Sequence, residues 1–176
     1  GRGRVLKLVA TALEGVYLVE LEPVRDERGF FARSYSDALF GELLPHIAQS
    51  GISFNARKGT LRGMHYQREP HAEAKLVRCS RGAIFDVVVD LRNAQWLGTE
   101  LSADNHRMLY VPEGFGHGFQ SLEDDSEVTY LISREYHPEV AAGFRWNDPA
   151  FNIQWPAGVT VTTERDRSGP AISTSQ

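Results

Sequence analysis

Short runs of alternating apolar and β-branched residues recur along the chain, separated by Gly, Pro, Asn and Asp. Such a pattern predicts many short strands joined by tight turns, with little helix. We expect strands at residues 16–21, 30–35, 53–56, 60–66, 74–80, 83–91, 101–102, 108–111, 118–122 and 127–133. Strands at this spacing are typical of an all-β sandwich or small barrel of the jelly-roll kind.

One segment has a helical pattern instead. In "SDALFGELLPHI", Ser36 or Asp37 can cap a helix, four apolar residues follow, and Pro45 would end it. The chain has 176 residues, of which 41% are hydrophobic, and it shows neither a repeat nor a low-complexity linker. We therefore expect residues 1–176 to form a single domain with a substantial core.

Charge and apolar runs limit the possible partners. The net charge of −4 gives no general attraction to nucleic acid. The longest apolar run, "GAIFDVVVDL", contains two aspartates and is far shorter than the ~20 apolar residues of a membrane-spanning helix. The first residues lack a signal-peptide pattern, and Cys79 is a lone cysteine, so we expect a cytoplasmic protein with no membrane partner.

The stretch "GTLRGMHYQ", residues 59–67, places a cation and a proton carrier on a predicted strand. Arg62 and His65 are three residues apart, so a regular strand would point them to opposite faces. A bulge at Gly63 would bring both side chains to one side.

Motifs of several enzyme classes are missing. The six histidines do not fall into a metal-binding spacing, and "HYQREPHAEAK" lacks the paired His-x-His with a following Glu of jelly-roll metalloenzymes. The chain also contains no Gly-x-Ser-x-Gly motif and no phosphate-binding glycine loop with Lys-Ser/Thr. These absences argue against a catalytic metal, covalent acyl transfer and nucleotide hydrolysis.

Several polar side chains interrupt the predicted strands: Arg62, His65, Lys75 and Tyr130. Burying them without partners would be strongly unfavourable, so they either face water or converge on a polar cavity. His117 lies in "EGFGHGFQ", where three glycines allow the backbone to approach another group closely. These residues indicate a small-molecule pocket in a β-barrel.

The chain changes character after Trp155 and becomes polar and weakly patterned. Such a tail is either a frayed terminus or a segment docked on the domain. "TERDR" places an acid between two arginines, which suits docking.

Six stretches match one known family in sequence and in order: "DERGFF" (26–31), "GTLRGMHYQ" (59–67), "EAKLVRCSRGAIFDVVVDLR" (73–92), residues 101–133, "YHPE" (136–139) and "FRWNDPAFNIQWP" (144–156). The chain closely resembles the dTDP-4-dehydrorhamnose 3,5-epimerase family. Members are cupin-type jelly-roll enzymes that use no metal or other cofactor and invert stereocentres on nucleotide-linked 4-keto-6-deoxysugars. The resemblance implies an all-β, cupin-type jelly-roll β-barrel or sandwich with one or two short helices.

The resemblance also implies catalytic roles. A C–H beside a ketone becomes acidic only if the enolate is stabilised, so the site needs a base, an oxyanion partner and an acid on the other face. His65 matches the family's base, and Asp166 matches the carboxylate that fixes its tautomer and docks the tail. Lys75 matches the cation at the enolate oxygen, and Tyr130 matches the acid.

Other matched positions are implied to bind substrate: Arg28, Phe30, Asn55, Arg62, His117 and Tyr136. Arg28 and Arg62 suit a diphosphate, because a guanidinium binds phosphate oxygens in a bidentate manner. His117 is expected in the sugar pocket, with Phe30 and Tyr136 as apolar or stacking walls. Family members are typically homodimers in which "DERGFF" reaches the neighbour's site.

The chain departs from the family pattern at the nucleotide end. Arg33 in "FARSY" replaces a Glu that helps to recognise thymine, and "ISFNARKGTLRG" is shorter than usual, whereas a separate deletion at "LRNAQWLGTEL" trims a surface turn. These changes make either a dTDP-linked or a CDP-linked sugar possible. Epimerisation at C3, at C5 or at both carbons also stays open, because the same groups serve either position.

Three alternatives remain at this point. A non-catalytic jelly-roll that binds sugar nucleotides would keep the arginines and aromatics. It would not need Lys75, Tyr130 and a His65–Asp166 pair together. A 4-keto sugar ketoisomerase would place its acid groups differently. A purely structural β-domain would explain none of the polar set.

Overall fold

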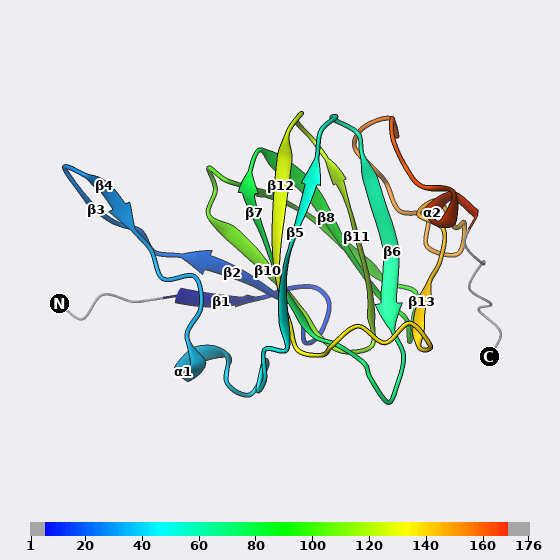
Figure 1. The fold of residues 1–176 in the computed structure, drawn as a ribbon, viewed down its shortest axis with the longest axis horizontal. Coiled ribbons are helices and arrows are strands. Elements are labelled where there is room, and N and C mark those ends of the chain that lie inside the picture. Colours follow the sequence, from blue (N-terminus) through cyan, green and yellow to red (C-terminus); the bar gives the residue numbers. More distant parts are fainter. Residues whose placement is uncertain (1–5, 169–176) are drawn as a thin grey trace.

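Two antiparallel sheets face each other in the computed structural model, which describes residues 6–168 (Figure 1). One has six strands in the order β1 (Leu6–Ala10), β2 (Tyr17–Leu21), β10 (Arg107–Val111), β7 (Lys75–Arg81), β12 (Ser126–Ile132) and β5 (Gln49–Asn55). The other has five, in the order β13 (Ala141–Gly143), β6 (Leu61–Gln67), β11 (Phe115–Ser121), β8 (Ala83–Asp90) and β9 (Trp96–Ser102). The predicted all-β jelly-roll architecture is confirmed.

The main core lies between the two sheets. Val77 and Val128 of the first sheet and Ile84, Val88 and Phe119 of the second are buried in one cluster. Val77 and Cys79 alternate with polar Arg78 and Ser80 along β7, so every second side chain of this part of the strand points into the core. Strand β8, by contrast, is buried over nearly its whole length.

A bulge interrupts the pairing of β6 with β11. His65 pairs with His117 and Arg62 pairs with Phe119, so β6 contains one residue more than β11 over this interval. Gly63 has φ +129°, and a Cβ there would lie 2.6 Å from the Cα of Gly118. The expected bulge is thus present, and a glycine is required at its closest approach to β11.

A small hairpin extends from the sandwich on the side opposite α2 (Glu164–Ser168; Figure 1). It consists of β3 (Val24–Asp26) and β4 (Gly29–Phe31), joined by a turn in which Asp26 Oδ1 accepts a hydrogen bond from the backbone N–H of Arg28 at 2.8 Å. The predicted strand 30–35 was wrong beyond Phe31. Residues 32–36 belong to no strand, because this segment connects β4 to the helix α1 (Asp37–Phe40).

Other boundaries also differ from the expectations. Strand β5 begins at Gln49 rather than at residue 53, and β9 begins at Trp96 rather than at residue 101. The helix expected from "SDALFGELLPHI" is present as α1, but it ends at Phe40, well before Pro45. Strands β1, β3 and β13 were not predicted. No helix in the described residues is long and apolar enough to cross a membrane.

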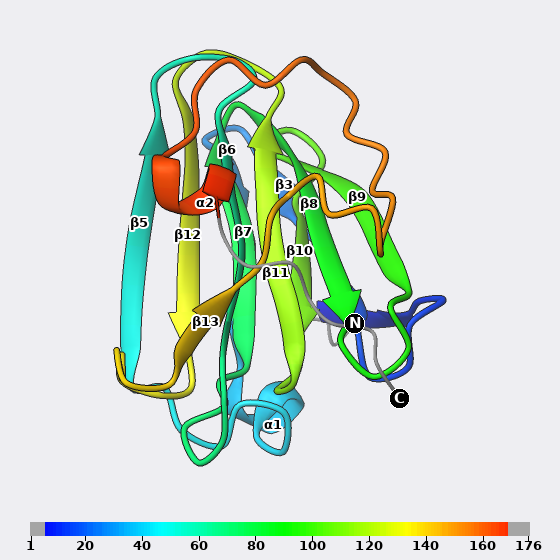
Figure 2. The ribbon, with the colours of Figure 1, turned by 90° about the vertical axis from the view of Figure 1, so that its right-hand side faces the viewer.

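The segment after Trp155 runs along the start of β6 (Figure 2). Thr160 donates its backbone N–H to Gly59 O at 3.1 Å, and Val161 O accepts from Leu61 N–H at 2.9 Å. The chain then forms α2 (Glu164–Ser168) beside β6. Backbone hydrogen bonds therefore fix the position from which α2 presents its side chains.

Candidate active site

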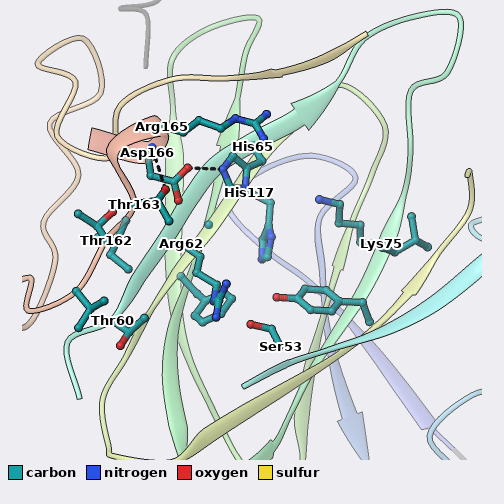
Figure 3. A pocket seen from close by; sticks show the side chains of 16 residues that line it. Ser53, Thr60, Arg62, His65, Lys75, His117, Thr162, Thr163, Arg165 and Asp166 are labelled. Atoms are coloured by element: carbon teal, nitrogen blue, oxygen red, sulfur yellow. Dashed lines mark hydrogen bonds and ion pairs between the residues drawn. The ribbon is translucent and has the colours of Figure 1, made fainter. Parts of the chain in front are cut away.

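A cavity of about 630 Å³ opens between the two sheets and is bordered by the tail (Figure 3). It is lined by six of the predicted site residues: Arg62, His65, Lys75, His117, Tyr130 and Asp166. They come from both sheets and from α2, so positions far apart in sequence meet in one place. In Figure 3, His65 and Asp166 lie together on one side of the cavity, with Lys75 on the other.

His65 is bonded to the docked tail. Its Nε2 lies 2.6 Å from Asp166 Oδ1, and Asp166 Oδ2 accepts the backbone N–H of Gly63 at 3.1 Å. Burial opposes ionisation of Asp166, but these hydrogen bonds outweigh it and hold the pKa of the carboxyl below its usual value. An ionised Asp166 accepts a hydrogen bond from a protonated Nε2, which leaves Nδ1 of His65 as the nitrogen with a free lone pair.

A second histidine and aspartate pair lies deeper. Nε2 of His117 lies 2.6 Å from Oδ1 of Asp86, which is fully buried. The ring of His117 also meets that of Tyr130 edge-on, with centroids 6.4 Å apart. Among the described residues, the other oxygen of Asp86 is buried without a hydrogen-bond partner. Asp86 therefore fixes the orientation of His117 at the cavity wall.

Lys75 enters the cavity from the start of β7. Its Nζ lies 3.3 Å from Glu73 Oε1, and both side chains are 13% exposed. An ammonium with so little access to water needs a counter-charge, and Glu73 provides it. The pair fixes a positive charge opposite the His65 side of the cavity.

Tyr130 lies on β12, in the sheet that faces β6. Burial and the negative charge of Asp86 raise the pKa of its hydroxyl. The phenol therefore stays protonated throughout the neutral range and can donate a proton or a hydrogen bond from the wall opposite His65.

Arg62 is held by the edge strand β5. Its Nε donates to Asn55 Oδ1 at 2.8 Å, and its Nη2 donates to Phe54 O at 3.0 Å. Asn55 is 1% exposed and also donates to Ser126 O at 3.1 Å. Asn55, which was predicted to bind substrate, is thus placed behind Arg62, where it orients the guanidinium.

Three other predicted binding residues lie outside the cavity. Arg28 and Phe30 are on the β3–β4 hairpin, where they border a separate surface pocket of about 440 Å³. Tyr136 lies in the loop after β12 and is 59% exposed. Arg33 is exposed beyond β4 and does not border the cavity either. Within this chain, the cavity holds the groups expected at the sugar and only part of those expected at the nucleotide.

The cavity also contains residues that were not predicted. Ser53, Thr60, Thr162, Thr163 and Arg165 line it, and Glu73 and Asp86 support two of its side chains. A signal for Asp86 exists in the sequence, because a lone carboxylate inside the apolar run "AIFDVVV" must have a buried partner. Thr162 and Thr163 have no such signal, since only the docking of the tail brings them to the cavity.

Comparison with known proteins identifies the family of the chain. The model of the dTDP-4-dehydrorhamnose 3,5-epimerase family matches residues 10–174. The epimerase of that name from Methanothermobacter thermautotrophicus is 41% identical, over 92% of each chain. A dTDP-4-dehydrorhamnose 3-epimerase from Streptomyces niveus is 37% identical, over 92% of this chain and 82% of its own.

A solved structure gives the same result. The dTDP-4-dehydrorhamnose 3,5-epimerase of Bacillus anthracis, with TDP and PPi bound, superposes with a TM-score of 0.88 at 38% identity and covers 95% of this chain and 99% of its own. The predicted family is therefore confirmed, and the chain belongs to the dTDP-4-dehydrorhamnose 3,5-epimerases, a family of isomerases.

Proposed function

We propose that this protein epimerises a 4-keto-6-deoxyhexose linked to a nucleoside diphosphate. The observation that carries the proposal is the arrangement of three groups around one cavity: a His65 and Asp166 pair, the Lys75 cation and the protonated Tyr130. A binding module needs no such combination, because a bound sugar is recognised without a base and an acid on opposite walls.

His65 is the base in this mechanism. Both C3 and C5 of the sugar flank the C4 ketone, so their hydrogens become acidic once the carbonyl oxygen is stabilised. Nδ1 of His65 takes the proton. The ionised carboxylate of Asp166, hydrogen-bonded to Nε2 of the same ring, stabilises the imidazolium that forms. Lys75 stabilises the negative charge that develops on the C4 oxygen.

Tyr130 completes the inversion. It lies on β12, whereas His65 lies on β6 of the facing sheet, so the two groups reach a sugar in the cavity from opposite sides. Because its pKa is raised, the phenol retains its proton until the enolate takes it. Removal on one face and return on the other changes the configuration of the carbon.

The nucleotide that carries the sugar is proposed to be dTDP. Arg62, oriented by Asn55, provides the guanidinium at the cavity for phosphate oxygens. Thymidine is favoured over cytidine by the relative from B. anthracis, which holds TDP.

A homodimer would supply the remaining binding groups. Phe30 and Phe31 on the hairpin are 49% and 65% exposed, and Ile52 and Phe54 on the edge strand β5 are 71% and 47% exposed. Apolar residues on a projecting hairpin and a sheet edge are typical of surfaces that a second copy covers. In such a dimer, Arg28 and Phe30 would act at the partner's cavity.

The test is solvent deuterium incorporation, followed by NMR, into dTDP- and CDP-linked 4-keto-6-deoxyglucose. We expect exchange at C3, at C5 or at both carbons with the dTDP sugar, and no exchange with His65→Ala. Binding without exchange would favour the non-catalytic module, and a 3-keto product would favour the ketoisomerase. Faster exchange of the CDP sugar would contradict the proposed nucleotide.

A further inference from the structure

Two histidines and a glutamate meet outside the cavity, on two loops that each connect one sheet to the other. His71 lies between β6 and β7, and His137 and Glu139 lie between β12 and β13. One ligand atom from each of the three lies within 4.8 Å of the others. None of the three lines the cavity.

We propose that His71, His137 and Glu139 bind one divalent transition-metal ion such as Zn²⁺. Two imidazoles and one carboxylate are a donor set that suits zinc and its neighbours, whereas Mg²⁺ and Ca²⁺ prefer oxygen alone. Three protein ligands leave a coordination position for water. The ion would be structural, since no group of the proposed reaction is among its ligands.

A buried side chain fixes the backbone of both histidines. Gln67 lies at the end of β6 and is 4% exposed. Its Nε2 donates a hydrogen bond to His71 O at 2.6 Å, and its Oε1 accepts one from the backbone N–H of His137 at 3.1 Å. Its Nε2 also donates to Glu135 O at 3.1 Å. One amide therefore holds the two loops together, so the entropy of bringing the ligands together is lost during folding rather than at metal binding.

The side chains of the three ligands can bind a metal ion after one small rotation. The rings of His71 and His137 stack at a centroid distance of 3.5 Å with an angle of 5° between planes, and Nδ1 of His137 lies 3.0 Å from Glu139 Oε1. Parallel rings do not aim their lone pairs at one point, so one ring has to turn about its Cβ–Cγ bond. Both histidines are partly exposed, and the turn therefore displaces solvent rather than core.

The charge of the cluster suits a cation. Its one carboxylate, on Glu139, lies 3.0 Å from Nδ1 of His137, so an oxygen ligand already lies against one of the two imidazoles. A metal ion binds imidazole in its neutral form, so two such ligands and one carboxylate together supply a single negative charge to a divalent cation.

Titration calorimetry of tag-free, metal-stripped protein with Zn²⁺ tests the proposal, with Co²⁺ absorption to report imidazole ligation. We expect one ion per chain, binding at least about tenfold weaker in His71→Ala and in Glu139→Gln, and no comparable binding of Mg²⁺. The melting temperature should rise with Zn²⁺ in the unaltered protein and not in His71→Ala.

Two control variants identify the site. His46→Ala removes an exposed histidine outside the cluster, and His65→Ala removes the cavity histidine; both should bind Zn²⁺ as the unaltered protein does. Circular dichroism establishes that His71→Ala is folded. Equal affinity of His71→Ala and the unaltered protein, or loss of binding in His65→Ala alone, would overturn the proposal.

Discussion

His65 of β6 and His117 of β11 are cross-strand partners, and each imidazole is bonded through Nε2 to an aspartate at 2.6 Å. The two pairs differ in access to the cavity: the side chain of His65 is 41% exposed, whereas that of His117 is 6% exposed. A base has to exchange its proton with solvent after each turnover, so the open pair suits that role. The enclosed pair suits a fixed hydrogen-bonding wall.

Replacing the carboxylate of the open pair should slow catalysis more than binding. Asp166→Asn removes the charge that stabilises the imidazolium, and we expect kcat to fall by about two orders of magnitude with little change in KM. The matched control is Glu164→Gln, the same chemical change on an exposed residue of α2, which should leave kcat unchanged. An equal fall in both variants would mean that the damage is to α2 itself.

Tyr130→Phe separates exchange from inversion. The variant retains His65 and Lys75, so the sugar should still exchange hydrogen for deuterium, but the deuterium should return from the face it left. NMR would then show label without change of configuration. Normal inversion by the phenylalanine variant would exclude Tyr130 as the acid.

The state of Asp166 should appear in the pH dependence of stability. Its folded pKa is lowered below the ordinary value of 3.8, so its stabilisation is present above that value and is lost as the pH falls through the folded pKa. The difference in unfolding free energy between the unaltered protein and Asp166→Asn should therefore stay constant near neutral pH and shrink as the pH falls from the neighbourhood of 3.8 to below it. Urea unfolding at several pH values measures it, and a difference that grows on acidification would contradict the hydrogen bonds to His65 and Gly63.

Glu73 should position Lys75 rather than merely balance its charge. Glu73→Ala removes the acceptor at 3.3 Å from Nζ, and we expect kcat to fall roughly tenfold. Glu73→Gln keeps an oxygen acceptor, so it should fall less. If the glutamine variant loses as much activity as the alanine variant, the charge of Glu73 is what matters.

Gly63→Ala should be severely destabilising. Its φ of +129° is strained for any side chain, and the new Cβ would meet the backbone of Gly118 at 2.6 Å. We expect a loss of about 3 kcal/mol or more in the free energy of unfolding, measured with urea. Gly51→Ala on β5 is the control, because a Cβ there has open space and no such loss should follow.

Much of the fold was predictable because its strands either alternate between partly buried and exposed residues, as in β5, or form short apolar runs bounded by turn residues, as in β8. The hairpin β3–β4 and the short strand β13 gave little signal, since a three-residue strand is too short for a pattern to show. The long β5 was underestimated because Gln49, Ser50 and Gly51 carry no strand signal and are held there by pairing with β12.

The site was predictable where chemistry requires rare residue types within apolar strands, as for His65, Lys75 and Tyr130. It was not predictable where tertiary contacts decide the role. Asn55 orients Arg62 from behind, and Arg28 lies in the turn of the projecting β3–β4 hairpin, outside the cavity of its own chain; residue type alone indicates neither position. Sequence identifies which groups a reaction needs, while register and docking determine which of them share a cavity.

The docked tail has a consequence for the order in which the enzyme is made. Synthesis proceeds from the N-terminus, so the ribosome has completed every strand of both described sheets at Gly143 before it adds Asp166. A chain released between these two residues would contain the barrel, the imidazole and the lysine, yet its base would lack the carboxylate partner. Under the proposed mechanism, activity is therefore acquired late in synthesis, after the sheets that surround the cavity.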